Sequence, residues 1–278
     1  LTGSNQRSQW DRSPVRGAAY AQTKLEFSGM IANLGLRADY TAPGGDWYDF
    51  ENFDSRFGAV PTQNGDPRPA LDTLFTTVPI ESQFTLSPRL GVSFPVTSVS
   101  KLYFNYGHFR AVPDPDDLYL VRVYSDGGQL SRIANPNAPL PKTVAYELGY
   151  EQSFMDQFLA RVAGYYKDVS LQPYLVTYIG RSGSVDYDTS EPNSYEDIRG
   201  FELTLSRNRG RWLQGFVNYT YSIFSSGYFG FPTIYENTSE QRDQEQSDSA
   251  RRNSQSEAQP RPYARMNLDL LTPKEFGP

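Results

Sequence analysis

The chain has 278 residues, a net charge of −6 at neutral pH, 38% hydrophobic residues and no cysteine. The acidic balance argues against nucleic acid as a partner, because phosphate contacts need clustered Lys and Arg. The lack of cysteine removes thiol nucleophiles, disulfides and thiolate metal sites, and the lack of any run of about 18 apolar residues excludes a transmembrane helix.

Two long alternating strands are predicted first, at Arg16 to Phe27 and Met30 to Thr41, with Ser28-Gly29 as the turn between them. In the second strand, apolar and polar side chains alternate for eleven residues, about twice the usual strand length. The same pattern predicts further strands at about 83–95, 101–111, 142–154, 158–168, 195–207, 213–223 and 263–272. Short turns alternate with long connections at about 42–81, 112–140, 171–194 and 226–260.

Three features of this pattern indicate the fold class. Strands of this length match what a tilted strand needs to cross a bilayer. Short turns that alternate with long loops are typical of outer-membrane barrels, and so is a chain with 20 Tyr and 17 Phe, because aromatic girdles line both membrane interfaces. Charged residues recur at every second position within strands, which the interior of a soluble sandwich rarely accepts. We therefore expect an all-β, antiparallel meander of long transmembrane strands, part of a large outer-membrane β-barrel, with about nine strands here. A soluble sandwich or solenoid is the alternative.

The alternation also predicts which face of each strand meets lipid. One face carries leucines, and we expect it to point outward: Leu34, Leu36, Leu148, Leu203 and Leu268. The other carries charges, and we expect it to point to a wet lumen: Arg37, Glu147, Glu202 and Asp269. An odd number of strands leaves the first and last strands parallel, so we expect an open, strongly curved sheet that neither closes nor transports alone.

Several blocks, each on a predicted strand or at a turn, carry a resemblance to a known family. They are GAAYAQTKLEF, MIANLGLRADY, LSPRLGVSFPVT, LYFNYGHF, NPNAPLPKTVAYELGYEQ, GYYKDVS, IRGFELTLSR, GFVNYTYS and the final NLDLLTPKEFGP. In this order they resemble the C-terminal barrel region of the TonB-dependent receptors, especially the branch typical of Bacteroidetes-like bacteria. The resemblance spans essentially the whole chain except its loops.

The resemblance implies a domain assignment: residues 1–278 are a partial TonB-dependent receptor β-barrel domain, without the plug domain and the C-terminal strands. Barrels of such transporters have 22 strands and a plugged lumen. The chain is then expected in the outer membrane of a Gram-negative bacterium, with no enzymatic activity and no cofactor. The implied partners are outer-membrane lipid, an inner-membrane TonB-type energising complex reached through the absent N-terminal region, a transported small molecule or oligomer, and a surface lipoprotein.

The expected function is uptake of a bulky, scarce nutrient with TonB-supplied energy, the nutrient being a siderophore, an oligosaccharide, a peptide or a cobalamin-like compound. One alternative is a passive porin or structural barrel protein. A second alternative is a secreted, soluble, carbohydrate-binding β-protein.

Candidate site residues are few. His108, the single histidine, is interpreted as an interfacial polar aromatic, because no nucleophile or carboxylate partner is indicated by spacing. Glu147 and Glu151 share a strand face about 13 Å apart, which suits a lumen lining and not a cooperating pair. An acidic loop suggests a weak calcium candidate, although its spacing is not that of an EF-hand: Asp114, Asp116 and Asp117.

Loop aromatics are the candidates for contact with a transported molecule, because rigid amphipathic rings give large contact area at low entropic cost. They are Trp47, Tyr48, Tyr124, Tyr174 and Tyr187, and ordinary girdle or loop packing is the alternative role for each. The stretch 236–259, rich in Glu, Gln, Ser, Arg and Asn, is predicted to be a mobile extracellular loop.

Overall fold

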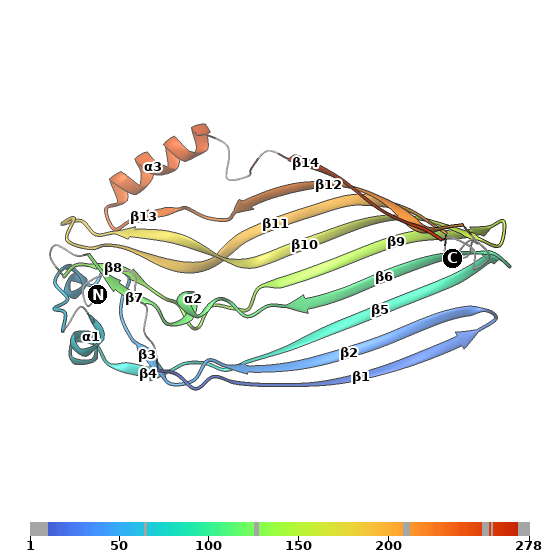
Figure 1. Ribbon diagram of the computed structural model, residues 1–278. Helices are drawn as coiled ribbons and strands as arrows, with labels where there is room; N and C mark the ends of the chain where they lie inside the picture. The colour runs from blue at the N-terminus through green and yellow to red at the C-terminus, as the bar shows by residue number, and fades with distance from the viewer. Residues whose placement is uncertain are drawn as a thin grey trace, which may run out of the picture.

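The computed structural model describes residues 11–63, 66–124, 128–207, 212–251, 256 and 258–271. Nine long strands of this part of the chain follow one path in a single curved sheet, each antiparallel to the next (Figure 1). In sheet order they are β1 (Val15–Phe27), β2 (Met30–Ala42), β5 (Gln83–Thr97), β6 (Ser100–Arg110), β9 (Lys142–Phe154), β10 (Phe158–Ile179), β11 (Asp186–Arg207), β12 (Leu213–Tyr228) and β14 (Gln259–Leu270). The predicted all-β, nine-strand meander is confirmed.

The sheet is an open half-barrel. Within the described residues, β1 and β14 each have one strand neighbour, so each leaves an outer edge unpaired. Tight turns join the strands at one end, and the long connections gather at the other (Figure 1). Two of the turns hold both central residues at positive φ, Ser28 with Gly29 and Met155 with Asp156, as hairpins of the right-handed twist require. The predicted Asn208-Arg209-Gly210 turn and the chain beyond Leu271 lie outside the described residues.

Side chains on the two faces of the sheet differ in exposure as well as in chemistry. Along β11 from Ile198 to Ser206, less exposed and more exposed residues alternate strictly. The more exposed positions are Arg199, near the loop-cap end, followed by the apolar Phe201, Leu203 and Leu205, which is the pattern of a curved sheet whose convex face is mainly apolar. The predicted lipid-facing leucines and lumen-facing charges lie on opposite faces, as their cross-strand register shows.

The predicted loop at 171–194 is wrong. β10 and β11 continue through it as a hairpin of two 22-residue strands that projects beyond the neighbouring strands. The register shifts twice between Val169 and Tyr174, and Leu171 has a φ of 59° there. Pro173 and Pro192, which disfavour a regular ladder, lie beside this irregularity, and paired strand resumes beyond it.

The connections predicted at 42–81 and 112–140 fold into local structure instead of open loops. They contain short strands and helices: β3 (Asp46–Tyr48), η1 (Ser55–Gly58), α1 (Arg68–Leu74), β4 (Thr77–Pro79), α2 (Pro115–Tyr119), β7 (Val121–Val123) and β8 (Leu130–Ile133). β3 pairs with β4 in a second, two-stranded sheet, whereas β8 adds to β11 in parallel.

These connections and the projecting hairpin share one hydrophobic core. Its buried members are Trp47, Tyr48, Phe57, Val60, Leu71, Phe75, Leu120, Val123, Leu130, Ile133, Ala134, Val176, Tyr178, Val185 and Tyr187. We call this unit, formed by residues 42–82, 112–141 and 171–194, the loop cap, and the strand segments outside it the barrel wall. The loop cap lies at the end of the sheet opposite the tight turns (Figure 1).

The prediction of a loop over 236–259 is wrong for Thr238–Arg251, which forms α3. The preceding β13 (Thr233–Tyr235) pairs in parallel with the end of β10. In Figure 1, α3 stands away from the sheet, above β12 and β13. In the described part of the chain, no helix is long and apolar enough to cross a membrane.

Candidate transport wall and loop cap

A polar network lines the less exposed face of the wall. Antiparallel register sets Lys101 and Arg161 opposite Glu151 from the two neighbouring strands. The Glu151 carboxylate accordingly receives Lys101 Nζ at 2.9 Å and Arg161 Nη2 at 2.7 Å. Glu147, four residues along β9, instead accepts a hydrogen bond of 3.0 Å from the Tyr103 hydroxyl. The two glutamates thus hold separate partners, and their role as lumen lining fits this arrangement.

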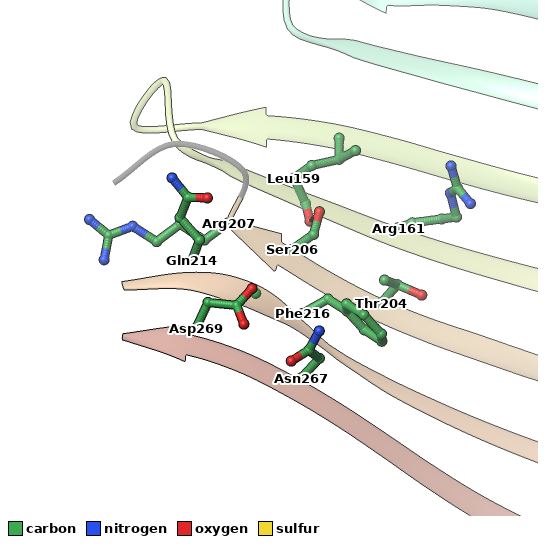
Figure 2. Close-up of a pocket in the computed structure, with 10 residues that line it drawn as sticks. Leu159, Arg161, Thr204, Ser206, Arg207, Gln214, Phe216, Asn267 and Asp269 are labelled. Carbon is green, nitrogen blue, oxygen red and sulfur yellow. Dashed lines mark hydrogen bonds between the residues drawn. The ribbon is translucent and has the colours of Figure 1, made fainter. Parts of the chain in front are cut away.

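The network extends across the next strands. Asn218 Nδ2 donates to Glu202 Oε1 at 2.6 Å and to Thr204 Oγ1 at 2.9 Å, from β12 to β11. A hollow of about 520 Å³ opens beside these residues near the turn end of the wall. Figure 2 shows its lining, in which polar side chains come from four strands: Arg161, Thr204, Ser206, Arg207, Gln214, Asn267 and Asp269. Such a surface offers hydrogen bonds to a passing polar solute or to protein that occupies the inside of the barrel.

The exposed face carries an aromatic ladder. Tyr106, Tyr146 and Tyr166 are cross-strand neighbours on β6, β9 and β10, with ring centroids 5.2 and 6.3 Å apart. His108 lies one step further on the same face, and its Nε2 is 2.6 Å from the Tyr106 hydroxyl. Tyrosines at a membrane interface keep the ring in the apolar layer and the hydroxyl in the wet layer. The position of His108 agrees with its interpretation as an interfacial polar aromatic.

Three of the five aromatic candidates are buried in the loop cap. Trp47 and Tyr48 lie on β3, and the Tyr48 hydroxyl donates to Asp72 Oδ1 at 2.9 Å. Tyr187, on β11, is only 1% exposed and donates to the carbonyl of Asn52 at 2.9 Å. Burial, helped in Tyr48 by the nearby Asp72 carboxylate, raises the pKa of both phenols far above the usual value. In this structure the three rings are part of the hydrophobic core of the cap.

The other two aromatic candidates lie nearer the surface. Tyr124 is 44% exposed. Tyr174 packs against the cap core and stacks on Tyr228 of β12, with ring centroids 4.6 Å apart. Sequence reasoning missed Tyr228, because the strand was predicted to end near residue 223 and Tyr228 fell in the predicted connection, whereas β12 continues to Tyr228. Contact of these rings with a transported molecule stays a prediction.

The acidic loop residues serve the start of α2. Asp114 occupies the N-cap position, and Asp116 and Asp117 lie in the first turn, where a helix favours negative charge. Asp117 Oδ1 accepts hydrogen bonds from Arg132 Nη2 at 3.0 Å and from Ser190 Oγ at 2.8 Å. Among the described residues, no group of three or more His, Cys, Asp or Glu side chains is placed to hold a metal ion. Calcium binding at this loop stays a prediction.

Two ionisable groups in the cap hairpin have perturbed pKa values. Burial is the main cause that raises the pKa of Tyr178 to about 12, and burial also raises the pKa of Glu191 above its usual range. The Tyr178 hydroxyl donates to Glu191 Oε1 at 3.4 Å, which opposes the second shift only in part. We expect this half-buried carboxyl to make the cap sensitive to pH.

Other residues that join the cap loops had no clear signal in the sequence. The Tyr119 hydroxyl donates to the carbonyl of Pro43 at 2.7 Å, from α2 to the first connection. Phe57 is fully buried and meets the Tyr187 ring edge-on at 5.1 Å. For Phe57 the signal was the density of aromatics in the first connection, whose spacing follows no helical or strand period; Tyr119 lies in the second connection.

A family model described as "TonB dependent receptor-like, beta-barrel" matches residues 1–271. A search of curated protein sequences returned no match. Among solved structures, the hemophore receptor HasR of Serratia marcescens, in complex with its hemophore HasA and heme, is 16% identical with a TM-score of 0.53. That alignment covers 78% of this chain and 42% of HasR.

Two further solved structures are similar at lower scores. The copper transporter OprC is 14% identical with a TM-score of 0.47, over 81% of this chain and 34% of that protein. The FrpB iron transporter of Neisseria meningitidis is 14% identical with a TM-score of 0.45, over 79% of this chain and 32% of that protein. The chain therefore spans about a third to two-fifths of the solved structures it matches, and these likenesses concern the fold.

Proposed function

Because the chain belongs to the TonB-dependent receptor-like β-barrel family, we propose that it forms part of the wall of a transporter that takes up a bulky, scarce nutrient across the outer membrane. The family locates the chain in the cell outer membrane of a Gram-negative bacterium. The proposal assigns residues 1–278 to the barrel domain and gives the plug domain and the remaining strands to other parts of the whole protein. TonB-supplied energy is part of the proposal.

The division of one sheet between two environments supports it most. Leucines and aromatic rings are the exposed side chains on one face, whereas the opposite face holds the hydrogen-bonded network around Glu151 and Glu202. A soluble protein rarely exposes a continuous apolar surface of this extent. This disfavours the secreted, soluble carbohydrate-binding alternative. The same arrangement suits an outward face in lipid and an inward face on an aqueous or plugged lumen.

The passive porin differs from an energised transporter in one measurable respect. A porin conducts solutes at a rate set by their gradient, so its flux persists when the inner membrane is de-energised. An energised transporter loses accumulation when its energy source is removed. The projecting loop cap, with Tyr174 and Tyr228 stacked at its base, supplies a surface on which a bulky solute is proposed to bind before entry.

The experiment uses the full-length protein in its own host. Cells with and without the gene are offered siderophores, cobalamin, peptides or oligosaccharides as the limiting nutrient, and uptake is measured before and after an uncoupler is added. We expect gene-dependent, saturable uptake of one nutrient class that stops with the uncoupler. Gene-dependent flux that is unsaturable and resists the uncoupler would establish the porin instead.

A further inference from the structure

The outward face of β6 and β9 changes character just beyond the tyrosine ladder. From the turn end up to Tyr106 and Tyr146, every outward residue of these two strands is uncharged: Leu102, Phe104, Leu148, Tyr150, Gln152 and Phe154. Beyond the ladder, the register places His108 opposite Val144 and then Arg110 opposite Lys142. Two cationic side chains, Arg110 and Lys142, thus lie immediately beyond the uncharged outward surface of these strands.

Arg110 and Lys142 form a like-charge pair. Side chains directly opposed on antiparallel strands lie close together, and equal charges there repel. Neither takes part in an ion pair within the described residues. Arg110 Nη1 donates to the carbonyl of Leu140 at 3.0 Å, and its Nε is buried without a hydrogen-bond partner. The sheet therefore holds two adjacent positive charges that no protein carboxylate balances by contact.

The position of Arg110 and Lys142 along the membrane normal places them at the level of the lipid headgroups. Arg110 lies four residues beyond Tyr106, and Lys142 lies four residues beyond Tyr146 in the same direction. Four residues of strand span about 13 Å, or about 10 Å along the membrane normal at the usual strand tilt. Because tyrosine girdles mark the boundary of the hydrocarbon core, the two cations face the polar layer of the leaflet on the side of the loop cap.

We propose that Arg110, Lys142 and His108 bind the phosphate of an anionic lipid headgroup in the outer leaflet. Basic clusters at headgroup level attract lipid phosphates, and Arg is suited to hold two phosphate oxygens at once. The Tyr106 hydroxyl holds the His108 ring through the contact at Nε2, so the imidazole forms a fixed polar edge below the two cations. The register places His108, Arg110 and Lys142 at adjacent outward positions of β6 and β9, so the three side chains form one site.

The neighbouring strands set the boundary of the site. On β10 and β11, Asp168 and Asp197 are directly opposed at the level of Val144, and Asp197 accepts a hydrogen bond from Tyr166 at 2.7 Å. Arg199, opposite Tyr166, shares that face, so β10 and β11 carry both signs of charge there, whereas the outward residues of β6 and β9 include cations and no carboxylate. Lys167, the neighbour of Asp168, lies on the opposite face of the sheet and lies over the Tyr165 ring. Lys167 therefore provides a positive charge at a similar position along the membrane normal, on the face that does not meet lipid.

The test uses the full-length protein purified in mixed micelles and does not depend on transport. The probe is a bisphosphorylated glycolipid, compared with the same lipid after enzymatic removal of its phosphates. Lipid retained per protein is measured by mass spectrometry after repeated washing. We expect preferential retention of the phosphorylated lipid, reduced about fivefold by loss of either cation and about 25-fold in Arg110→Gln/Lys142→Gln. The control Arg89→Gln/Lys167→Gln removes two positive charges from the inward face and is expected to leave retention unchanged.

Three results would overturn the proposal. They are equal retention of the two lipids by the unaltered protein, an equal loss of retention in the inward-face control, and full displacement of the lipid by an equal concentration of inorganic phosphate. If the double variant fails to fold, as judged by heat-modifiable gel migration, the single Lys142→Gln variant decides. A fivefold loss in that variant supports the site, and unchanged retention excludes it.

Discussion

The barrel wall and the loop cap use apolar side chains in opposite ways. In the wall, Leu148 is 54% exposed and points away from the sheet, whereas in the cap Phe57 is fully buried among other aromatic rings. The wall is held by a continuous backbone ladder, which satisfies every interior strand without a packed core. The cap is held by side-chain burial, as in a small soluble domain.

The difference is the one expected of a chain that folds against two solvents. In the proposed transporter, lipid covers the apolar face of the wall, so the wall needs only alternation and register. Water surrounds the cap, so its three segments must supply a core of their own, and tyrosine hydroxyls tie them together through main-chain carbonyls at Pro43 and Asn52. Substitutions are therefore expected to act by different rules in the two regions.

The largest effect is expected at the centre of the cap core. Phe57→Ala removes a fully buried ring that contacts Phe50, Phe75 and Tyr187. Loss of such a ring costs about 3–5 kcal/mol. Hydrogen exchange in the full-length protein should show faster exchange throughout the cap and unchanged protection in the wall. Phe229→Ala, at a ring that is 67% exposed, is the matched control and should change neither region. Loss of protection in both regions would contradict the separation.

The next effect concerns the apolar face of the wall. Leu36→Arg or Leu148→Arg places a charge in the hydrocarbon layer and should cost about 2–4 kcal/mol near the membrane midplane. The same substitution on the inward face, Thr204→Arg, should be mild, because Thr204 lies beside the polar hollow. A membrane-folding titration compares the three variants. Equal tolerance on the two faces would disprove the assignment of lipid and lumen.

A smaller effect is expected from the loss of a single hydrogen bond in the cap. Tyr187→Phe keeps the buried ring but removes the hydroxyl that donates to Asn52. The net loss should be about 1 kcal/mol, with part of it from the carbonyl left without its donor. Limited proteolysis of the first connection measures it. Tyr20→Phe, at a position of β1 that is 77% exposed, is the control.

The smallest effect is a pH dependence of the cap. Because burial raises the pKa of Glu191, the folded cap favours the protonated carboxyl. Cap stability should be highest below the ordinary glutamate pKa and should fall as pH rises from that value to the raised one. Glu191→Gln should remove this slope and slow hydrogen exchange of the hairpin at neutral pH. An unchanged slope in the variant would assign the effect to another group.

The sequence predicted the wall well, because its determinants are local. Alternation, turn residues and strand length appear directly in stretches such as Met30 to Tyr40, and antiparallel order follows from short connections. That Leu203 and Glu202 lie on opposite faces was also predictable, since side chains alternate along a strand with a period of two.

The cap was not predictable by the same means. Phe57, Phe75 and Tyr187 are far apart in the sequence and follow no common period, so nothing local indicates that they meet. Pro173 and Pro192 are unusual inside a strand, and an irregular register accommodates both within the projecting hairpin. The helix α3 has a single apolar residue, Ala250, so no amphipathic period predicted it. The five aromatic candidates were therefore identified without a way to separate core rings from surface ones.

The most direct test of the two-solvent account is a cysteine scan along β11, because this chain contains no cysteine of its own. Single cysteines are placed from Phe201 to Ser206 in full-length protein freed of other thiols and reconstituted into liposomes. We expect the thiols at the positions of Glu202, Thr204 and Ser206 to react with a charged, water-soluble maleimide. Those at the positions of Phe201, Leu203 and Leu205 should stay unreactive and, once labelled with a fluorophore, be quenched from the lipid phase. Uniform reactivity along the strand, or the reverse alternation, would contradict the account.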